Sequence, residues 1–181
     1  MENRRVSSSN IFAKECIVSA LLQLIEKKPL STITISELCQ KAGVSRMTFY
    51  RNYGSKEDVF DKNLKDIFEK YKRDDIFHEN EGIYYDRRHM IHYFQYLYQY
   101  KDFMRGLMSC GFGTLFMEKL NQFVLDKWKD YADIYTLTAF SGALFNVFHL
   151  WSTNHYEENV ELLAEKMEQV FYQKETAPGN N

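Results

Sequence analysis

The residues best suited to chemistry in this sequence lie between Thr34 and Lys56, and most of them are hydrogen-bond donors. A guanidinium such as that of Arg46 or Arg51 can donate two hydrogen bonds to the O6 and N7 of a guanine. Ser, Thr and Tyr hydroxyls can hold phosphate oxygens, and a Thr or Met methyl group can contact a thymine methyl. This set of side chains therefore favours contact with double-stranded DNA.

Two short helices are predicted to position these side chains. Thr34-x-x-Glu37 has the form of a capping box, so a helix is expected over residues 35–42, and Gly43 can end it in the left-handed conformation. Ser45 can then cap a second helix over residues 46–52, in which Phe49 points inward. Two short helices joined by a glycine turn form a helix-turn-helix, which places its second helix in the major groove.

The rest of the chain is predicted to be helical as well. Apolar periodicity predicts a first helix over residues 10–28 that ends at Pro29, and Ser55-x-x-Asp58 begins another that ends near residue 73. A polar loop is expected over residues 74–86. Further helices are expected over residues 87–100, 101–109, 112–129, 134–153 and 157–172, and a disordered tail over 174–181. The fold class is therefore all-α with about nine helices.

Charge divides the chain. Up to Lys56 there are nine basic and four acidic residues, a net charge of +5, and the overall charge of -2 leaves -7 for the remainder. The basic part, residues 1–56, is called the head below, and the acidic part, residues 57–181, is called the body. This division of charge suggests that only the head binds a polyanion. We therefore predict a DNA-binding domain over residues 1–56 and a second domain over 57–181, linked by the helix of residues 56–73.

Composition narrows the class of protein further. The three cysteines offer neither a disulfide framework nor a paired zinc spacing, and no stretch approaches 18 uncharged apolar residues. The N-terminus lacks the apolar segment of a signal peptide. We expect a soluble cytoplasmic protein whose cysteines are reduced. It is expected to need no cofactor and not to bind a membrane.

The run from Thr34 to Lys56 resembles the TetR family of bacterial regulators. Ala42-Gly-Val-Ser-Arg46, Thr48-Phe-Tyr50, an aromatic residue at Tyr53 and Ser55-Lys56 stand in that order without a gap. Tyr53 replaces the commoner Phe, Gly54 a frequent Pro and Met47 a usually small residue.

The resemblance implies DNA contacts through Thr34, Ser45, Arg46, Met47, Thr48, Tyr50, Arg51 and Lys56. Thr34, Ser45, Tyr50 and Lys56 would contact phosphate, and the other four would face base edges. Thr34 and Ser45 could alternatively serve only as helix caps, and Arg51 could be only a solvated surface charge. Tyr53 is expected to pack.

The body carries a weaker resemblance, in which Phe140-Ser-Gly-Ala-Leu144, Trp151 and Asn154 match the penultimate helix of many family members. That helix and the last one pack on a two-fold mate, and a glycine in mid-helix suggests close approach of another helix. The expected dimer contacts are Phe140, Gly142, Ala143, Val147, Trp151, Leu163, Met167 and Phe171.

The resemblance also implies a ligand pocket among the aromatic-rich middle helices. Tyrosine hydroxyls among apolar rings would suit a small apolar or aromatic effector. The candidate ligand contacts are Phe94, Tyr98, Met104, Met108, Phe112, Phe116, Phe145 and Phe148. The family resemblance thus implies that the second domain, residues 57–181, is a regulatory and dimerisation domain.

These expectations describe a one-component transcriptional regulator, a ligand-released repressor that binds an inverted-repeat operator as a homodimer. The alternative is a co-regulator controlled by a protein partner or by a metal. His89 and His92 could share a helix face, but no Cys or carboxylate partner has a recognisable metal-ligand spacing, so no metal site is assigned. No glycine-rich phosphate loop or catalytic motif is present, so an enzyme is not expected.

Overall fold

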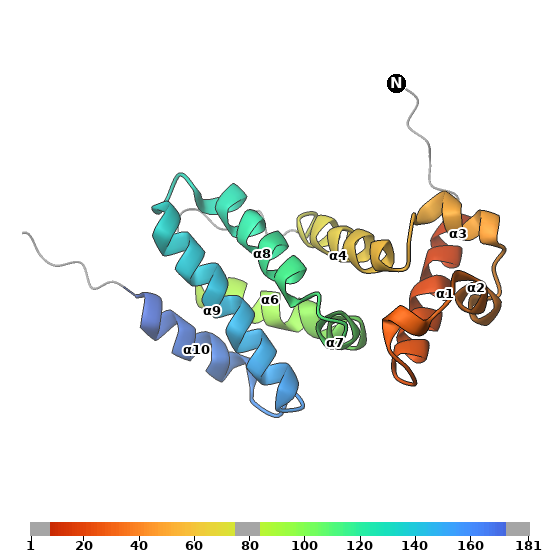
Figure 1. Cartoon of the computed structure of the whole chain (residues 1–181). Coiled ribbons are helices and arrows are strands. Elements are labelled where there is room, and N and C mark those ends of the chain that lie inside the picture. The colour runs from red at the N-terminus through yellow and green to blue at the C-terminus, as the bar shows by residue number, and fades with distance from the viewer. Residues whose placement is uncertain (1–7, 75–83, 173–181) are drawn as a thin grey trace, which may run out of the picture. The chain divides into compact units, whose positions relative to one another are not determined.

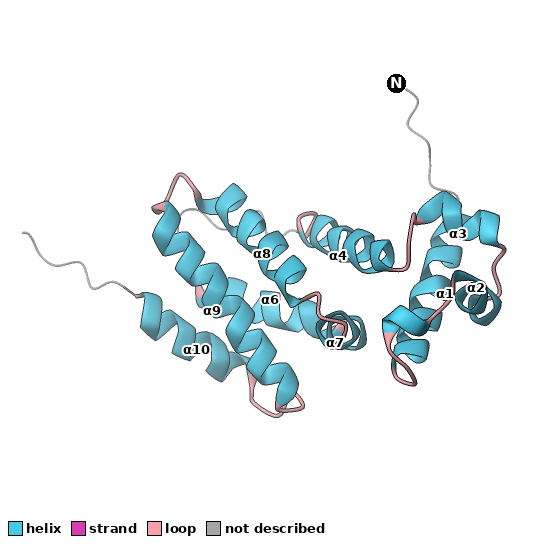
Figure 2. Cartoon of the chain, in the orientation of Figure 1, coloured by secondary structure: helices cyan, strands magenta, loops and turns pink. Residues whose placement is uncertain are grey.

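The computed structural model describes residues 8–74 and 84–172, and these residues form α-helices and one short 3-10 helix without a strand. The helices are α1 (Ser8–Ile25), η1 (Leu30–Thr32), α2 (Ile35–Ala42), α3 (Arg46–Asn52), α4 (Glu57–Tyr71), α6 (Arg87–Tyr98), α7 (Lys101–Ser109), α8 (Gly113–Trp128), α9 (Ile134–Thr153) and α10 (Val160–Phe171) (Figures 1 and 2). The predicted all-α class is confirmed, with nine α-helices in these two ranges. The expected tail lies outside the described residues.

Most predicted helix boundaries agree with the structure, because local caps set them. Helix α1 is an exception: it ends at Ile25, whereas the sequence predicted residue 28. The amides of Lys27 and Lys28 both donate to the carbonyl of Leu24, which forms a tight turn before Pro29. Proline disfavours the helical conformation of the residue before it, so Pro29 marks the last possible end of a helix and not its actual end.

Helix α10 also departs from the prediction, since it begins at Val160 instead of residue 157. His155 and Tyr156 have φ angles of 57° and 61°, which reverse the chain after α9. The indole Nε1 of Trp151 donates to the carbonyl of Glu158 at 2.9 Å, and the side chain of Asn159 accepts from the amides of Glu161 and Leu162. These bonds hold the turn and cap α10 three residues later than predicted.

The described chain forms two compact units. The first contains α1, η1, α2, α3, most of α4, α7 and the start of α8, from residues up to Phe68 and from Tyr100–Leu115. Its core is built on the buried face of α1, where Ile17 and Leu21 lie. Helix α7 packs on α1 through Gly106, at which an added Cβ would lie 2.5 Å from Leu22 Cδ2 and 2.9 Å from Ile25 Cδ1.

The second unit contains the end of α4 together with α6, most of α8, α9 and α10. Aromatic rings fill its core; for example, the ring of Phe140 lies 5.0 Å from that of Phe171 and 5.1 Å from that of Tyr84. Helix α6 packs on α10, and Arg87 donates to a carboxylate oxygen of Glu168 through Nε at 2.8 Å and Nη2 at 2.5 Å. Within the described residues no helix has the length and apolar character needed to cross a membrane.

Candidate nucleic-acid interface

Side-chain caps place helices α2 and α3. The hydroxyl of Thr34 accepts from the amide of Glu37 at 3.2 Å, and that of Ser45 accepts from the amide of Thr48 at 3.1 Å. Gly43, with a φ of 65°, makes the turn between the two helices, and its amide donates to the end of α2. The expected helix-turn-helix is therefore present, and both expected capping contacts are formed.

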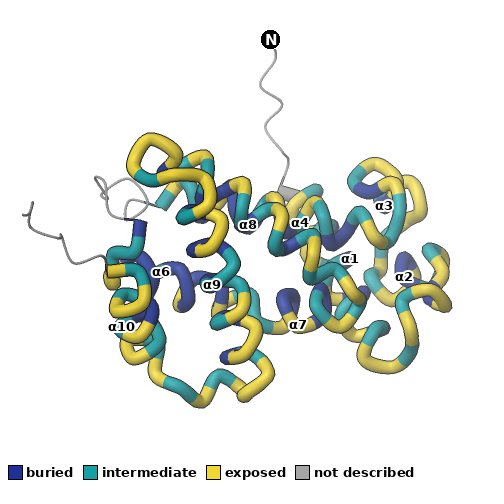
Figure 3. Tube along the Cα trace, turned by 60° about the vertical axis from the view of Figure 1, so that its left-hand side comes forward, coloured by how far each residue is buried: buried dark blue, intermediate teal, exposed yellow. Residues whose placement is uncertain are grey.

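Helix α3 is anchored by one side and free on the other. The ring of Phe49 is fully buried and lies 5.4 Å from the ring of Tyr50 and 5.8 Å from that of Tyr53. Phe49 is the buried residue of α3, and the rest of the helix is exposed or half-exposed (Figure 3). Met47 and Tyr50 expose 85% and 58% of their surface. A short helix that exposes large apolar side chains offers them to a partner.

Both arginines of α3 are exposed as well. Nη2 of Arg46 donates to the hydroxyl of Ser36 on α2 at 2.5 Å, so this guanidinium is held against the neighbouring helix. Ser36 was not predicted as a site residue, because the contact joins residues ten positions apart across the turn. Arg51 lies in the last turn of α3, where a cation also interacts favourably with the helix dipole.

Lys56 is half-buried and holds the backbone before α2. Its Nζ donates to the carbonyls of Ile33 at 2.8 Å and Ser31 at 3.2 Å. An ammonium has three donors, so one donor remains for a phosphate. The sequence motif indicated a phosphate contact for Lys56 but gave no sign of this tie to η1.

Tyr53 packs, as predicted, and it exposes only 1% of its surface. Its hydroxyl accepts from Asn63 Nδ2 at 3.2 Å. Burial raises the pKa of the Tyr53 phenol to about 12, partly opposed by the hydrogen bond from Asn63. Tyr53 therefore fixes α3 against α4 and takes no part in the exposed face.

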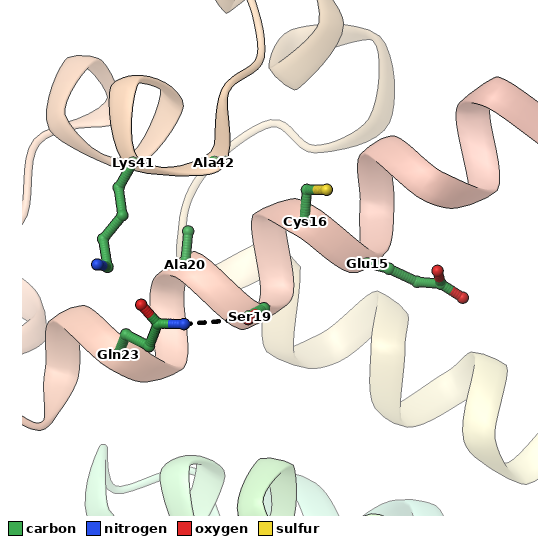
Figure 4. Close-up of a pocket in the computed structure, with 7 residues that line it drawn as sticks. All are labelled: Glu15, Cys16, Ser19, Ala20, Gln23, Lys41 and Ala42. Carbon is green, nitrogen blue, oxygen red and sulfur yellow. Dashed lines mark hydrogen bonds between the residues drawn. The ribbon is translucent and has the colours of Figure 1, made fainter.

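A groove of about 340 Å³ lies between α1 and α2 in the same unit (Figure 4). Lys41 extends from α2 toward Gln23 of α1, and Gln23 Nε2 donates to the hydroxyl of Ser19 at 3.3 Å (Figure 4). Glu15 points away from α2. The groove contains none of the expected DNA contacts.

The predicted ligand contacts fall in both units. In the second unit, the ring of Phe116 lies 5.3 Å from Phe145 and 5.8 Å from Phe148, and Phe94 lies 5.9 Å from Trp151. In the first, Met104 is buried, and Phe112 packs on Phe60 at 5.1 Å and lines a cavity of about 480 Å³ beside Ile25 and Leu30. The ligand assignment stays a prediction.

The predicted dimer contacts differ in exposure. Phe140, Trp151 and Met167 are buried within their own chain, whereas Gly142, Ala143, Val147, Leu163 and Phe171 are half-exposed. An added Cβ at Gly142 would meet no atom within 4 Å. Five further large apolar side chains on α9 and α10 are exposed: Ile134, Tyr135, Leu150, Leu162 and Val170.

The histidines that could bind a metal are engaged elsewhere. His89 Nδ1 lies 2.5 Å from Asp86 Oδ2, and His92 Nε2 lies 3.2 Å from Asp74 Oδ2. Burial lowers the pKa of His92, and the nearby Asp74 carboxylate opposes this shift. Within residues 8–74 and 84–172, no cluster of three or more His, Cys, Asp or Glu side chains could hold a metal ion.

The two capped helices, the glycine turn and the exposed face of α3 define a helix-turn-helix DNA-binding protein. Residues 17–62 match the family model described as bacterial regulatory proteins, tetR family. This match confirms, for the N-terminal region, the resemblance to the TetR family of bacterial regulators that the sequence motif predicted. No curated protein matches the chain significantly.

Solved structures share the fold over nearly the whole chain. A TetR transcriptional regulator from Streptococcus agalactiae 2603V is 18% identical, with 91% of this chain and 96% of that chain covered and a TM-score of 0.64. The dihydroxyacetone kinase operon activator DhaS is 16% identical over 89% and 94% of the two chains, with a TM-score of 0.61. The fatty acid degradation regulator FadR from Bacillus halodurans is 14% identical over 88% and 94%, with a TM-score of 0.56.

Proposed function

We propose that this protein is a ligand-released repressor that binds an inverted-repeat DNA operator as a homodimer. The observation that carries the DNA-binding part is the face of α3: Arg46, Met47 and Arg51 are exposed on a helix whose opposite side is fixed by the buried ring of Phe49. Such a helix enters the major groove without rearrangement of its own core.

The eight expected DNA contacts fit this role in two groups. Thr34, Ser45, Tyr50 and Lys56 lie at helix ends or on polar surface, where hydroxyls and an ammonium can hold phosphates and set the position of the protein on the duplex. Arg46, Met47, Thr48 and Arg51 are the base-reading group. Arg46 uses one of its five N–H donors on Ser36, so donors remain for the O6 and N7 of a guanine.

Dimerisation through α9 and α10 is supported by the open space at Gly142 and by exposed Leu150, Leu162 and Val170. Apolar side chains on neighbouring helices are expected to be covered by a second copy related by a two-fold axis. That axis makes the operator an inverted repeat, with recognition helices about 34 to 36 Å apart or a multiple of one helical turn.

Control by a small apolar effector is supported by the aromatic core of the second unit. An effector that binds the DNA-incompetent form more tightly lowers DNA affinity, by about 5- to 150-fold for ordinary allosteric couplings. The structural neighbour DhaS is named an activator, so a protein of this fold can also activate transcription. Measuring transcription from the operator with and without the protein decides between repression and activation.

The test is operator selection from random duplexes, followed by fluorescence titration at several salt concentrations. We expect a selected inverted repeat that is bound much more tightly than random DNA, with an affinity that falls as salt rises. Arg46→Ala should lower cognate affinity roughly 5- to 150-fold and relax one base position. Arg105→Ala, which removes an exposed arginine on α7, is the matched control. Enrichment of no sequence would refute the proposal and favour a co-regulator that acts through a protein partner.

A further inference from the structure

The core of the second unit contains a small cavity among aromatic side chains. Its volume is about 20 Å³, and it lies between residues of α4, α6, α8 and α9 and Tyr84. Its walls are formed by Tyr71, Tyr84, His89, Met90, Tyr93, Phe123, Trp128, Phe140 and Leu144. The set shares no member with the ligand contacts that the sequence predicted.

Two polar groups in this wall are buried without a hydrogen-bond partner among the described residues: the hydroxyl of Tyr93 and the indole Nε1 of Trp128. Tyr93 is 5% exposed and Trp128 6% exposed. Burial raises the pKa of the Tyr93 phenol well above its ordinary value, so this group keeps its proton. Buried donors almost always have a partner in folded proteins, and an unpaired one is destabilising.

Both groups ask for the same kind of partner. An indole N–H can only donate, whereas a protonated tyrosine hydroxyl can donate one hydrogen and can also accept. A hydrogen-bond acceptor is therefore the one kind of partner that can satisfy both groups. The surrounding tyrosine, phenylalanine and tryptophan rings supply flat apolar contacts, which favour an aromatic molecule.

Charge in the wall narrows the class of ligand. Among the described residues that line the cavity, His89 alone has a basic side chain, and its Nδ1 already lies 2.5 Å from the carboxylate of Asp86. A carboxylate ligand would be buried here without a cation of its own, which is strongly unfavourable. An uncharged acceptor such as a ketone or aldehyde oxygen needs no counter-ion.

We propose that this cavity is the ligand-free form of the effector site, and that the effector is an uncharged aromatic molecule whose carbonyl oxygen accepts from Tyr93 and Trp128. The proposal rests on the effector control proposed above and names the chemistry of that effector. A cavity of this size holds about one water molecule, so the ligand has to enlarge it. Met90, with its unbranched flexible side chain, forms part of the wall that can give way.

The test compares two probes of nearly equal size, acetophenone and ethylbenzene, which differ in the carbonyl oxygen. Binding to the full chain is measured by ligand-observed NMR titration. We expect acetophenone to bind at least about fivefold more tightly, because it gives the buried donors an acceptor. Tyr93→Phe, which removes only the hydroxyl, should reduce this preference by at least about threefold while ethylbenzene binding stays within about twofold.

Tyr96→Phe is the matched control, since Tyr96 is buried on the same helix but does not line the cavity. It should leave the acetophenone preference unchanged. The proposal is overturned if neither probe binds, which is the result expected for a cavity that holds a buried water only. It is equally overturned if both probes bind alike, or if the preference survives in Tyr93→Phe.

A DNA titration of the same samples separates this proposal from the proposed function. Probe binding with the expected preference, in a protein that selects no DNA, supports the site and refutes the regulator. Specific DNA binding without any probe binding refutes the site and leaves the regulator standing. If both hold, saturating acetophenone should weaken operator binding in the wild type more than in Tyr93→Phe.

Discussion

Lys56 combines a structural role with a proposed phosphate contact, and a substitution can measure both. Lys56→Ala removes the bonds to the carbonyls of Ser31 and Ile33, so we expect a loss of about 1 to 2 kcal/mol in unfolding free energy. Urea denaturation measures this loss. Lys65→Ala, at an exposed position on α4, is the control and should change stability by less than about 0.5 kcal/mol. Equal stability of wild type and Lys56→Ala would contradict the structural role.

Ser45 allows capping to be separated from DNA contact. Ser45→Ala removes the acceptor for the amide of Thr48 and should cost about 1 kcal/mol of stability. Ser45→Asp retains an acceptor that suits a helix N-terminus, so its stability should stay near that of the wild type. The added carboxylate should nevertheless repel phosphate and weaken DNA binding. If Ser45→Asp bound DNA as tightly as the wild type, Ser45 would be only a cap.

Lys127 gives a pH dependence with a definite sign. Burial lowers its pKa to about 8, from an ordinary value of 10.5, and its Nζ lies 4.9 Å from the centre of the Trp128 ring. Between these two values the unfolded chain binds the proton more readily, so this residue's contribution to stability rises with pH. The free energy of unfolding of Lys127→Met should therefore exceed that of the wild type most near pH 7. This difference in stability should become smaller by pH 9.5. Urea titrations at the two pH values test this; a constant advantage would contradict it.

At the residue scale, the sequence predicted what depends on near neighbours. The caps at Thr34 and Ser45 follow from bonds that span three positions, and such bonds are visible in a motif. The bond from Arg46 to Ser36 and the bonds from Lys56 to Ile33 and Ser31 span ten to 25 positions. They depend on how the helices pack, so no local pattern indicates them.

Gly106 and Gly142 both lie in the middle of a helix, but only Gly106 is packed against other side chains. Substitutions at the two positions should therefore change stability in opposite directions. Gly142→Ala should raise the stability of an isolated chain by about 0.5 to 1 kcal/mol, because alanine favours the helix and the added methyl meets no atom within 4 Å. Gly106→Leu should instead cost about 1 to 3 kcal/mol, because the space beside α7 is filled by Leu22 and Ile25. Thermal denaturation of a monomeric sample compares the two.

Gly142→Leu extends this comparison to the proposed dimer. A large side chain at an open position should leave the folded monomer intact and prevent the close approach of a second copy. Light scattering should then report monomers where the wild type gives dimers. A wild-type monomer at micromolar concentration, or a variant that still dimerises, would remove α9 from the proposed interface.

Most helix starts were predicted well from their caps, but the end of α1 and the start of α10, which border turns, were not. Asp86 and Asp133 cap α6 and α9 within the predicted bounds. Between α9 and α10, however, His155 and Tyr156 adopt left-handed conformations that usually require Gly or Asn. The sequence placed the connection at Asn154 and His155 but did not indicate that Asn159 caps the next helix, so the start of α10 was predicted too early.

At the scale of the whole molecule, charge separates the proposed DNA-binding head from the body. The salt dependence of binding counts the phosphates that are neutralised, with a slope near -0.9 for each one. If each of two chains loses one contact in Lys56→Ala, the slope should become less negative by about 2, against about 1 for a monomer. Titrations on one operator at several salt concentrations decide between these values, and an unchanged slope would exclude Lys56 from the contact set.

The first compact unit is assembled from two separate stretches of chain. This affects both the design of chimeras and the evolution of operator specificity. Helix α7 follows α6 in sequence, yet it covers the face of α1 at Leu22 and Ile25. A chimera that receives only the first 56 residues of a relative would join a foreign α1 to a resident α7. We expect such grafts to fold poorly unless residues 100–115 travel with the head, so new operator specificity should arise more readily by point changes on α3 than by exchange of whole heads.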